Sequence, residues 1–224
     1  KPENLHRAMT AKIFRECVIG ILDDLIDKGN YSYLEAKDLH HMVLSSMLDP
    51  DLDSTSFMKR LVTMLRQEQI PLFDLINNIV RGFNLLWNNS PHGHDYFYQM
   101  EVMDERVALG QALTMFQKHP TMDLTKLKRI AAGLSAPDSD LRWHERISQA
   151  LSGATYYNLI DMCFLSDPVS PQELQGTVNS WYYYDLVITR LNHFVGVHKD
   201  LRSGIANLAL VAMRENELLN MPSL

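Results

Sequence analysis

Cysteine is scarce in this sequence, and the two that occur, Cys17 and Cys163, both lie among apolar residues spaced as in helices. Small secreted domains use several disulfides to compensate for a limited core. Two cysteines in 224 residues cannot form such a framework. We therefore expect two free, buried thiols, a reducing compartment and a cytoplasmic location.

Positive charge is also in short supply. Lys and Arg number 21 against 27 Asp and Glu, which gives a net charge of -6 and no basic stripe. Because phosphate contacts supply much of the affinity for nucleic acids, we expect no nucleic-acid partner. No uncharged apolar run approaches the ~18 residues that a membrane span needs, and no signal-peptide pattern is present.

Strand signals are missing as well, since no run alternates apolar and polar residues between turn signals. Nearly every segment instead has helical periodicity, and the stretches SYLE and SPQE carry capping boxes. We predict an all-α fold of about ten helices in an antiparallel bundle or an irregular stack of helical hairpins. Residues 1–224 are expected to form one domain, with a break between sub-bundles near 88–95 as the alternative. The expected helices cover residues 4–28, 32–48, 56–68, 71–87, 95–118, 124–134, 139–151, 155–165, 171–197 and 201–219.

The first predicted helix contains the acidic stretch GILDDLIDKGN. At 100° per residue its apolar residues occupy one broad face, which comprises Ile13, Phe14, Cys17, Val18, Ile21, Leu22, Leu25 and Ile26. Asp23 and Asp27 fall on the opposite face with Lys12 and Glu16. We interpret this acidic face as solvent-exposed.

The same aspartates resemble the aspartate-rich motif of class I terpene synthases. The resemblance implies that Asp23 and Asp27 coordinate Mg²⁺, a hard cation that prefers oxygen ligands, and that the metal binds a diphosphate. That family carries a second metal motif, and KDLRSGIAN is the nearest stretch in this chain. Asp200 and Ser203 match it, whereas Lys199 and Asn207 replace two of its metal ligands.

Histidines form two further groups, His40-His41 and the turn sequence His92-Gly93-His94-Asp95. A His-Asp pair is similar to the metal site of HD-type phosphohydrolases, which are also helical, and His94 with Asp95 would be the ligands here. We interpret His92 and His94 as loop residues and Asp95 as the cap of the following helix. His40 and His41 point to different faces, so only one of them could join a site.

The ninth predicted helix places polar residues within an apolar stripe. Asp185 falls between Trp181 and Ile188, and Thr189 and Asn192 lie close to the same line. A buried carboxylate needs a partner. The partner is either an internal arginine or helix N-terminus, or else a ligand or protein bound by Trp181, Asp185, Thr189 and Asn192.

These observations favour a protein-interaction or regulatory helical module without catalytic activity, with another protein as its partner and no cofactor. The alternative is a metal-dependent enzyme that acts on a phosphate or diphosphate ester with Mg²⁺ or another divalent metal. The oligomeric state is left open.

Replacing both Asp23 and Asp27 by Asn separates the two interpretations of the acidic face. We expect calorimetric titration with Mg²⁺ to give the same small heat for wild type and variant, because an exposed helical face does not organise the several oxygen ligands that the cation needs. A wild-type binding heat that disappears in the variant would contradict this expectation.

Overall fold

A computed structural model describes residues 2–118, 124–134, 140–151, 155–203 and 207–215 of the chain. These residues form ten α-helices and one short 3₁₀ helix, with no strand among them. The predicted all-α class and the number of helices are therefore confirmed. Within the same described ranges, no helix is long and apolar enough to cross a membrane.

The helices follow one another in the order that the capping and turn signals predict. They are α1 (Pro2–Lys28), α2 (Tyr33–Leu48), α3 (Ser54–Met64), η1 (Gln67–Leu72), α4 (Phe73–Asn88), α5 (Phe97–Lys118), α6 (Leu124–Ala132), α7 (Trp143–Leu151), α8 (Thr155–Cys163), α9 (Pro171–Ser203) and α10 (Leu208–Glu215). Several boundaries differ from the prediction: α5, α7 and α10 begin later than expected, at Phe97, Trp143 and Leu208. Two further differences concern α3 and α9. The helix expected over 56–68 is divided into α3 and η1. The ninth helix was expected to end near residue 197, but α9 continues to Ser203.

Local hydrogen bonds explain why the capping signals were reliable. Ser32 N–H donates to the Glu35 carboxylate at 2.8 Å, and Glu35 N–H donates to the Ser32 hydroxyl at 3.3 Å. Ser170 and Glu173 repeat this reciprocal pair at 2.9 and 3.3 Å ahead of α9. Each pair satisfies backbone N–H groups that a helix start leaves unbonded, so the signal lies entirely within four residues.

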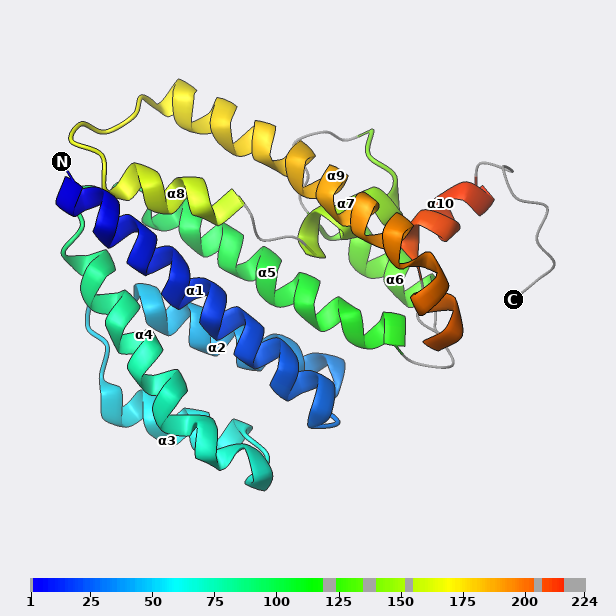
Figure 1. The fold of residues 1–224 in the computed structure, drawn as a ribbon, viewed down its shortest axis with the longest axis horizontal. Coiled ribbons are helices and arrows are strands. Elements are labelled where there is room, and N and C mark those ends of the chain that lie inside the picture. The colour runs from blue at the N-terminus through cyan, green and yellow to red at the C-terminus, as the bar shows by residue number, and fades with distance from the viewer. Residues whose placement is uncertain (1, 119–123, 135–139, 152–154, 204–206, 216–224) are drawn as a thin grey trace.

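The helices pack in an irregular stack rather than a symmetric bundle (Figure 1). α1 packs against α4 and α8, and α2 packs against α4 and α5. α9 runs along one edge of the molecule, where it contacts α7, α8 and α10. The larger of two apolar core clusters includes residues of α1 to α5, α8 and α9, while the smaller one joins residues of α5, α6, α7 and α10. The single domain and its alternative break near 88–95 stay predictions.

A charged pair lies inside the larger core. Arg15 of α1 is fully buried and forms an ion pair with Asp104 of α5, which is 3% exposed. The guanidinium also lies 5.5 Å from the ring centroid of Phe83 and 5.2 Å from that of Tyr156. These contacts compensate for the removal of the charge from water.

Arg15 corrects the predicted orientation of α1. Ile13 and Cys17, which we expected to be buried, are exposed, and the Ile13 side chain is 56% exposed. The buried face of α1 is narrower than the predicted one and is centred on Val18 and Leu22. The cause is the ion pair to α5, which turns Arg15 inward and moves Ile13 to the surface.

The two adjacent histidines of α2 lie in opposite environments, as their helical spacing predicts. His40 is fully buried and its Nδ1 lies 3.1 Å from the Ala36 carbonyl oxygen, whereas His41 is exposed. Burial disfavours the charged imidazolium and lowers the pKa of His40 from 6.5 to about 4, although the Ala36 carbonyl partly opposes the shift.

This lowered pKa predicts an acid-sensitive fold. Between pH 6.5 and 4 only the unfolded chain protonates His40, so the free energy of unfolding decreases as the pH falls through this window. From pH 7 to pH 5 the loss should amount to about 2 kcal/mol, and His40→Met should remove it. Urea unfolding at the two pH values measures the difference.

The matched control is His41→Met, which changes the exposed neighbour on the same helix. It should retain the full wild-type loss. An equal loss in His40→Met and wild type would show that His40 does not cause the acid sensitivity.

Candidate protein-interaction site

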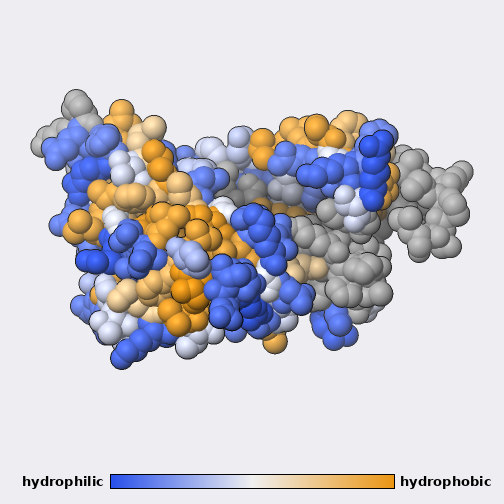
Figure 2. Space-filling model, turned by 60° about the horizontal axis from the view of Figure 1, so that its bottom comes forward, coloured by the Kyte–Doolittle hydropathy of each residue, from blue (hydrophilic) through white to orange (hydrophobic). Residues whose placement is uncertain are grey.

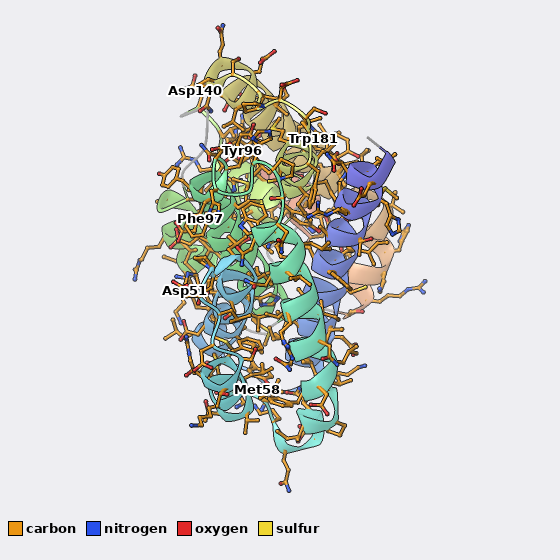
Figure 3. All side chains as sticks on the ribbon, turned by 90° about the vertical axis from the view of Figure 1, so that its left-hand side faces the viewer. Asp51, Met58, Tyr96, Phe97, Asp140 and Trp181 are labelled. Carbon is orange, nitrogen blue, oxygen red and sulfur yellow. The ribbon has the colours of Figure 1, made fainter. Side chains whose placement is uncertain are left out.

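The structure separates the four residues predicted to line a site on α9. Asp185 and Thr189 are buried, at 2% and 6% exposed, while Trp181 is half-buried and Asn192 is exposed. Trp181 of α9 lies in the upper part of the view in Figure 3, and Met58 of α3 lies in the lower part. The predicted burial of Asp185 is confirmed, but Asn192 does not share its environment.

Asp185 belongs to a buried polar cluster that joins α9 to α5. Arg106 of α5 is 8% exposed, and its guanidinium carbon lies 4.2 Å from the ring centroid of Tyr182, one turn before Asp185. Burial lowers the pKa of Arg106, and the nearby Tyr182 and Asp185 oppose that shift. An internal cation therefore lies within electrostatic reach of the buried carboxylate. This agrees with the interpretation in which the partner of Asp185 is an internal arginine.

Further polar contacts continue along the second half of α9. Arg190 donates to the Leu208 carbonyl at 2.8 Å and contacts the ring of His144 on α7. Asn207 donates to the Asp200 carboxylate at 2.7 Å and to the His193 carbonyl at 2.5 Å. Leu174 and Tyr182 pack on the larger apolar core in the first half of α9, whereas polar and charged groups hold the inward side of its second half.

The opposite side of α9 is apolar and exposed. Its first four members are spaced three and four residues apart, and Val195 and Leu201 extend the row toward the end of the helix. We call the six the outward stripe: Tyr184 (46% exposed), Val187 (53%), Leu191 (54%), Phe194 (65%), Val195 (83%) and Leu201 (45%). Val187 and Leu191 each follow a buried polar residue by two positions, which places them roughly 160° around the helix from it. Hydrophobic residues cover the upper edge of the molecule where this part of α9 runs (Figure 2).

The polarity of α9 is therefore the reverse of that expected for a surface helix, which buries its apolar face and exposes its polar face. Scattered exposed apolar residues are normal, but a continuous row along one helix marks a contact surface. This row was not among the predicted site residues, which all came from the stripe that contains Asp185. The spacing of Tyr184, Val187, Leu191 and Phe194 was a visible signal for a second apolar face.

The acidic residues of α1 are only partly where the sequence placed them. Asp27 is exposed, as expected. Asp23 is half-buried, so the prediction that both aspartates are solvent-exposed was wrong for Asp23. Asp23 borders the buried Ile19 one turn earlier, and this neighbour explains the partial burial. Asp24 pairs with Lys28 at 2.7 Å on the exposed surface.

The stretch that resembles a second terpene-synthase motif has a structural role. Asn207 accepts hydrogen bonds from the backbone N–H groups of Ala209 and Leu210 at 3.1 and 3.2 Å, so it caps the start of α10. Its amide also holds Asp200, as described above. Both residues thereby join the start of α10 to the last turns of α9.

The histidine turn before α5 forms a local ion pair. His92 Nδ1 lies 2.9 Å from the Asp95 carboxylate, and His94 is exposed. α5 begins at Phe97 rather than next to Asp95, and the Asp95 carboxylate contacts His92 at the surface. Among the residues that the structure describes, no three His, Cys, Asp or Glu side chains converge as metal ligands.

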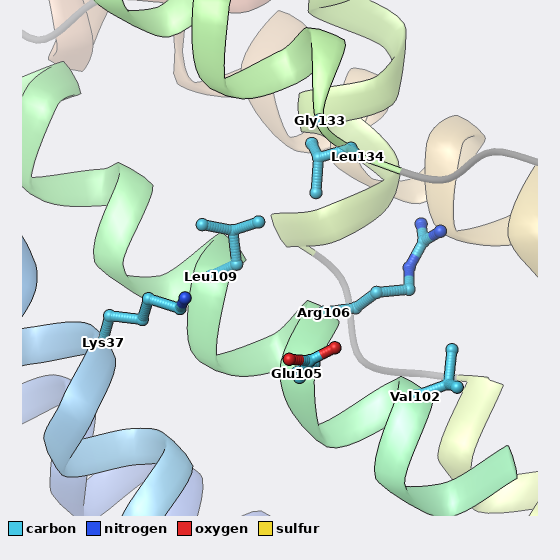
Figure 4. A pocket seen from close by; sticks show the side chains of 7 residues that line it. All are labelled: Lys37, Val102, Glu105, Arg106, Leu109, Gly133 and Leu134. Carbon is cyan, nitrogen blue, oxygen red and sulfur yellow. The ribbon is translucent and has the colours of Figure 1, made fainter. Parts of the chain in front are cut away.

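A pocket of about 230 Å³ lies on the other side of the buried cluster, between α5 and the end of α6. Its lining comprises Lys37, Val102, Glu105, Arg106, Leu109, Gly133 and Leu134 (Figure 4). Lys37 extends toward α5 from α2, and Leu134 approaches from α6. Because Arg106 also belongs to the cluster with Asp185, the pocket borders the contact that holds α9.

No protein-family model, curated protein or solved structure matches the chain significantly. The function is therefore argued from the geometry of the chain itself.

The buried cluster makes a direct prediction for Asp185→Ala. Removing the carboxylate leaves the buried Arg106 without its counter-charge, and we expect the free energy of unfolding to fall by about 3–5 kcal/mol. Denaturant unfolding measures the change. Asn192→Ala, on the same helix but exposed, should alter it by less than about 0.5 kcal/mol.

A second variant tests the pairing itself. Asp185→Leu combined with Arg106→Leu should be more stable than either single variant, because an apolar pair replaces a lone buried charge. Unchanged or increased stability in Asp185→Ala would instead indicate a carboxylate kept for binding a ligand.

Proposed function

We propose that this protein is a protein-interaction module whose outward stripe on α9 binds an apolar helical segment. The observation that carries the proposal is the reversed polarity of α9, with Asp185 and Thr189 buried while Leu191 and Phe194 are exposed. No catalytic step is part of the proposal.

The energetic argument concerns the exposed apolar area. Each Å² removed from water contributes roughly 25 cal/mol, so full burial of a leucine or phenylalanine contributes about 1.5–3 kcal/mol. The six members of the outward stripe are 45–83% exposed. Covering them is therefore a strong driving force for association. Aromatic residues such as Tyr184 and Phe194 are also enriched where interfaces bind most tightly.

The shape of the stripe favours a helix as the bound element. From Tyr184 to Leu201 it runs straight along one helix for roughly 25 Å. Spacings of three and four residues match the seam by which one helix packs along another. A helical partner can contact all members at once, whereas a compact ligand would cover only two or three.

The inward contacts support this role because they hold the stripe in place before a partner arrives. Asp185 is anchored beside Arg106, and Asn207 holds Asp200 at 2.7 Å near the end of α9. A preformed surface loses little conformational entropy on binding, which improves affinity.

A photo-reactive benzoylphenylalanine in place of Phe194 tests the proposal and keeps the stripe aromatic. Irradiation of the cells that produce the protein should yield a covalent adduct that is larger than the chain. Leu191→Asp in the same chain should abolish the adduct, because a carboxylate within the apolar contact would lose its hydration.

The matched control carries the photo-reactive residue at Tyr98 of α5, which is 71% exposed but lies outside the stripe. It should give no adduct that depends on Leu191. Absence of an adduct at position 194, or an adduct insensitive to Leu191→Asp, would overturn the proposed function.

A further inference from the structure

We infer that the helix that covers the outward stripe is α9 of a second copy of this chain, packed antiparallel about a two-fold axis between Leu191 and Phe194. This inference rests on the proposed function and names its partner. The argument uses the spacing of the stripe, the charges beside it and the area that it exposes.

The spacing is self-complementary in the antiparallel direction. The residues Tyr184, Val187, Leu191, Phe194, His198 and Leu201 occupy alternating a and d positions of a heptad pattern. In an antiparallel pair, each a position faces a d position of the other helix. Tyr184 then meets Leu201, Val187 meets His198, and Leu191 meets Phe194. A two-fold axis repeats every layer, so one continuous seam uses five of the six members of the outward stripe together with His198, and Val195 flanks the seam.

The charged residues of α9 favour an antiparallel over a parallel pairing of the two copies. The C-terminal end of the stripe carries His198, Lys199 and Arg202, whereas its N-terminal end carries the uncharged Tyr183 and Tyr184. Asp200 at the same end accepts a hydrogen bond from Asn207 within the chain. A parallel pair would therefore place Lys199 and Arg202 of both copies together, which is repulsive. An antiparallel pair instead places the two basic ends at opposite ends of the seam, each beside the uncharged tyrosine end of the other chain.

The exposed area suits a dimer. A stable interface buries ~800 Å² on each partner. The six members of the outward stripe, together with the 43% exposed Tyr183, expose several hundred Å² along one edge. The flanking stems of Lys199 and Arg202 are also exposed and extend the contact. The stripe therefore supplies the apolar centre of an interface, and the charged residues supply its rim.

Light scattering coupled to size exclusion tests self-association directly. Wild type should have twice the chain mass of 25.8 kDa, and Leu191→Asp should have the mass of one chain. The matched control is Ile13→Asp, which places the same charge on α1 at a residue 56% exposed, against 54% for Leu191. It should remain a dimer. A wild-type monomer at tens of micromolar, or dissociation by both variants alike, would overturn the inference.

Disulfide trapping tests the antiparallel direction. In a Cys17→Ser background, a mass-tagged Tyr184→Cys chain is mixed with an untagged Leu201→Cys chain and oxidised. The antiparallel pair predicts a rapid mixed disulfide, because the two positions are adjacent. Each single variant alone should link slowly, since its cysteines lie roughly 25 Å apart along the seam. Rapid linking of Tyr184→Cys to itself would show a parallel pair and overturn the inference.

The two proposals fail in different ways. The adduct formed at position 194 should have the mass of two copies of this chain. An adduct with a different protein, together with a monomeric wild type, would leave the proposed function intact and overturn the second copy as partner. Absence of any adduct dependent on Leu191 would overturn both.

Discussion

The buried polar face of α9 is the constraint on which the rest of the site depends: the ring centroid of Tyr182 lies 4.2 Å from the guanidinium carbon of Arg106, and the buried Asp185 acts electrostatically on the same cation. A carboxylate at 2% exposure cannot rotate into water without leaving the cation of α5 unpaired. With this face fixed inward, helical geometry alone directs Val187, Leu191 and Phe194 outward. The polar interior of α9 and its apolar exterior are thus two consequences of one constraint.

The inward and outward faces of α9 have different roles: the polar contacts of the inward face position the helix, and the apolar residues of the outward face are available for binding. Charged contacts inside the protein, including Asn207 with Asp200, give α9 one position but contribute little net stability, because desolvation offsets much of their attraction. The apolar residues that could have contributed core stability are instead exposed, where they can contribute to binding. Under the proposed function, the outward stripe is a surface whose residues are retained for binding at a cost to the stability of the free chain.

The sequence predicted those parts of the fold whose signals are local. The Ser32–Glu35 pair lies within four residues, so its prediction needed no tertiary information. Arg15 could not be placed in the core in this way, because Asp104 is 89 positions away in the chain. The same limit applies to Asp185. Its burial followed from the helical wheel, whereas its partner and the exposure of Asn192 depend on how α9 lies against α5 and α7.

The most direct test of the account is hydroxyl-radical footprinting of the whole protein over a range of concentrations, read by mass spectrometry. Leu191 and Phe194 should react readily in dilute solution and become protected as the concentration rises. Ile13 and Leu85, exposed elsewhere at 56% and 66%, should react equally at every concentration. Protection of Leu191 and Phe194 even at high dilution would place them in the core and contradict the outward stripe, and reactivity that never changes would contradict its burial by a second copy.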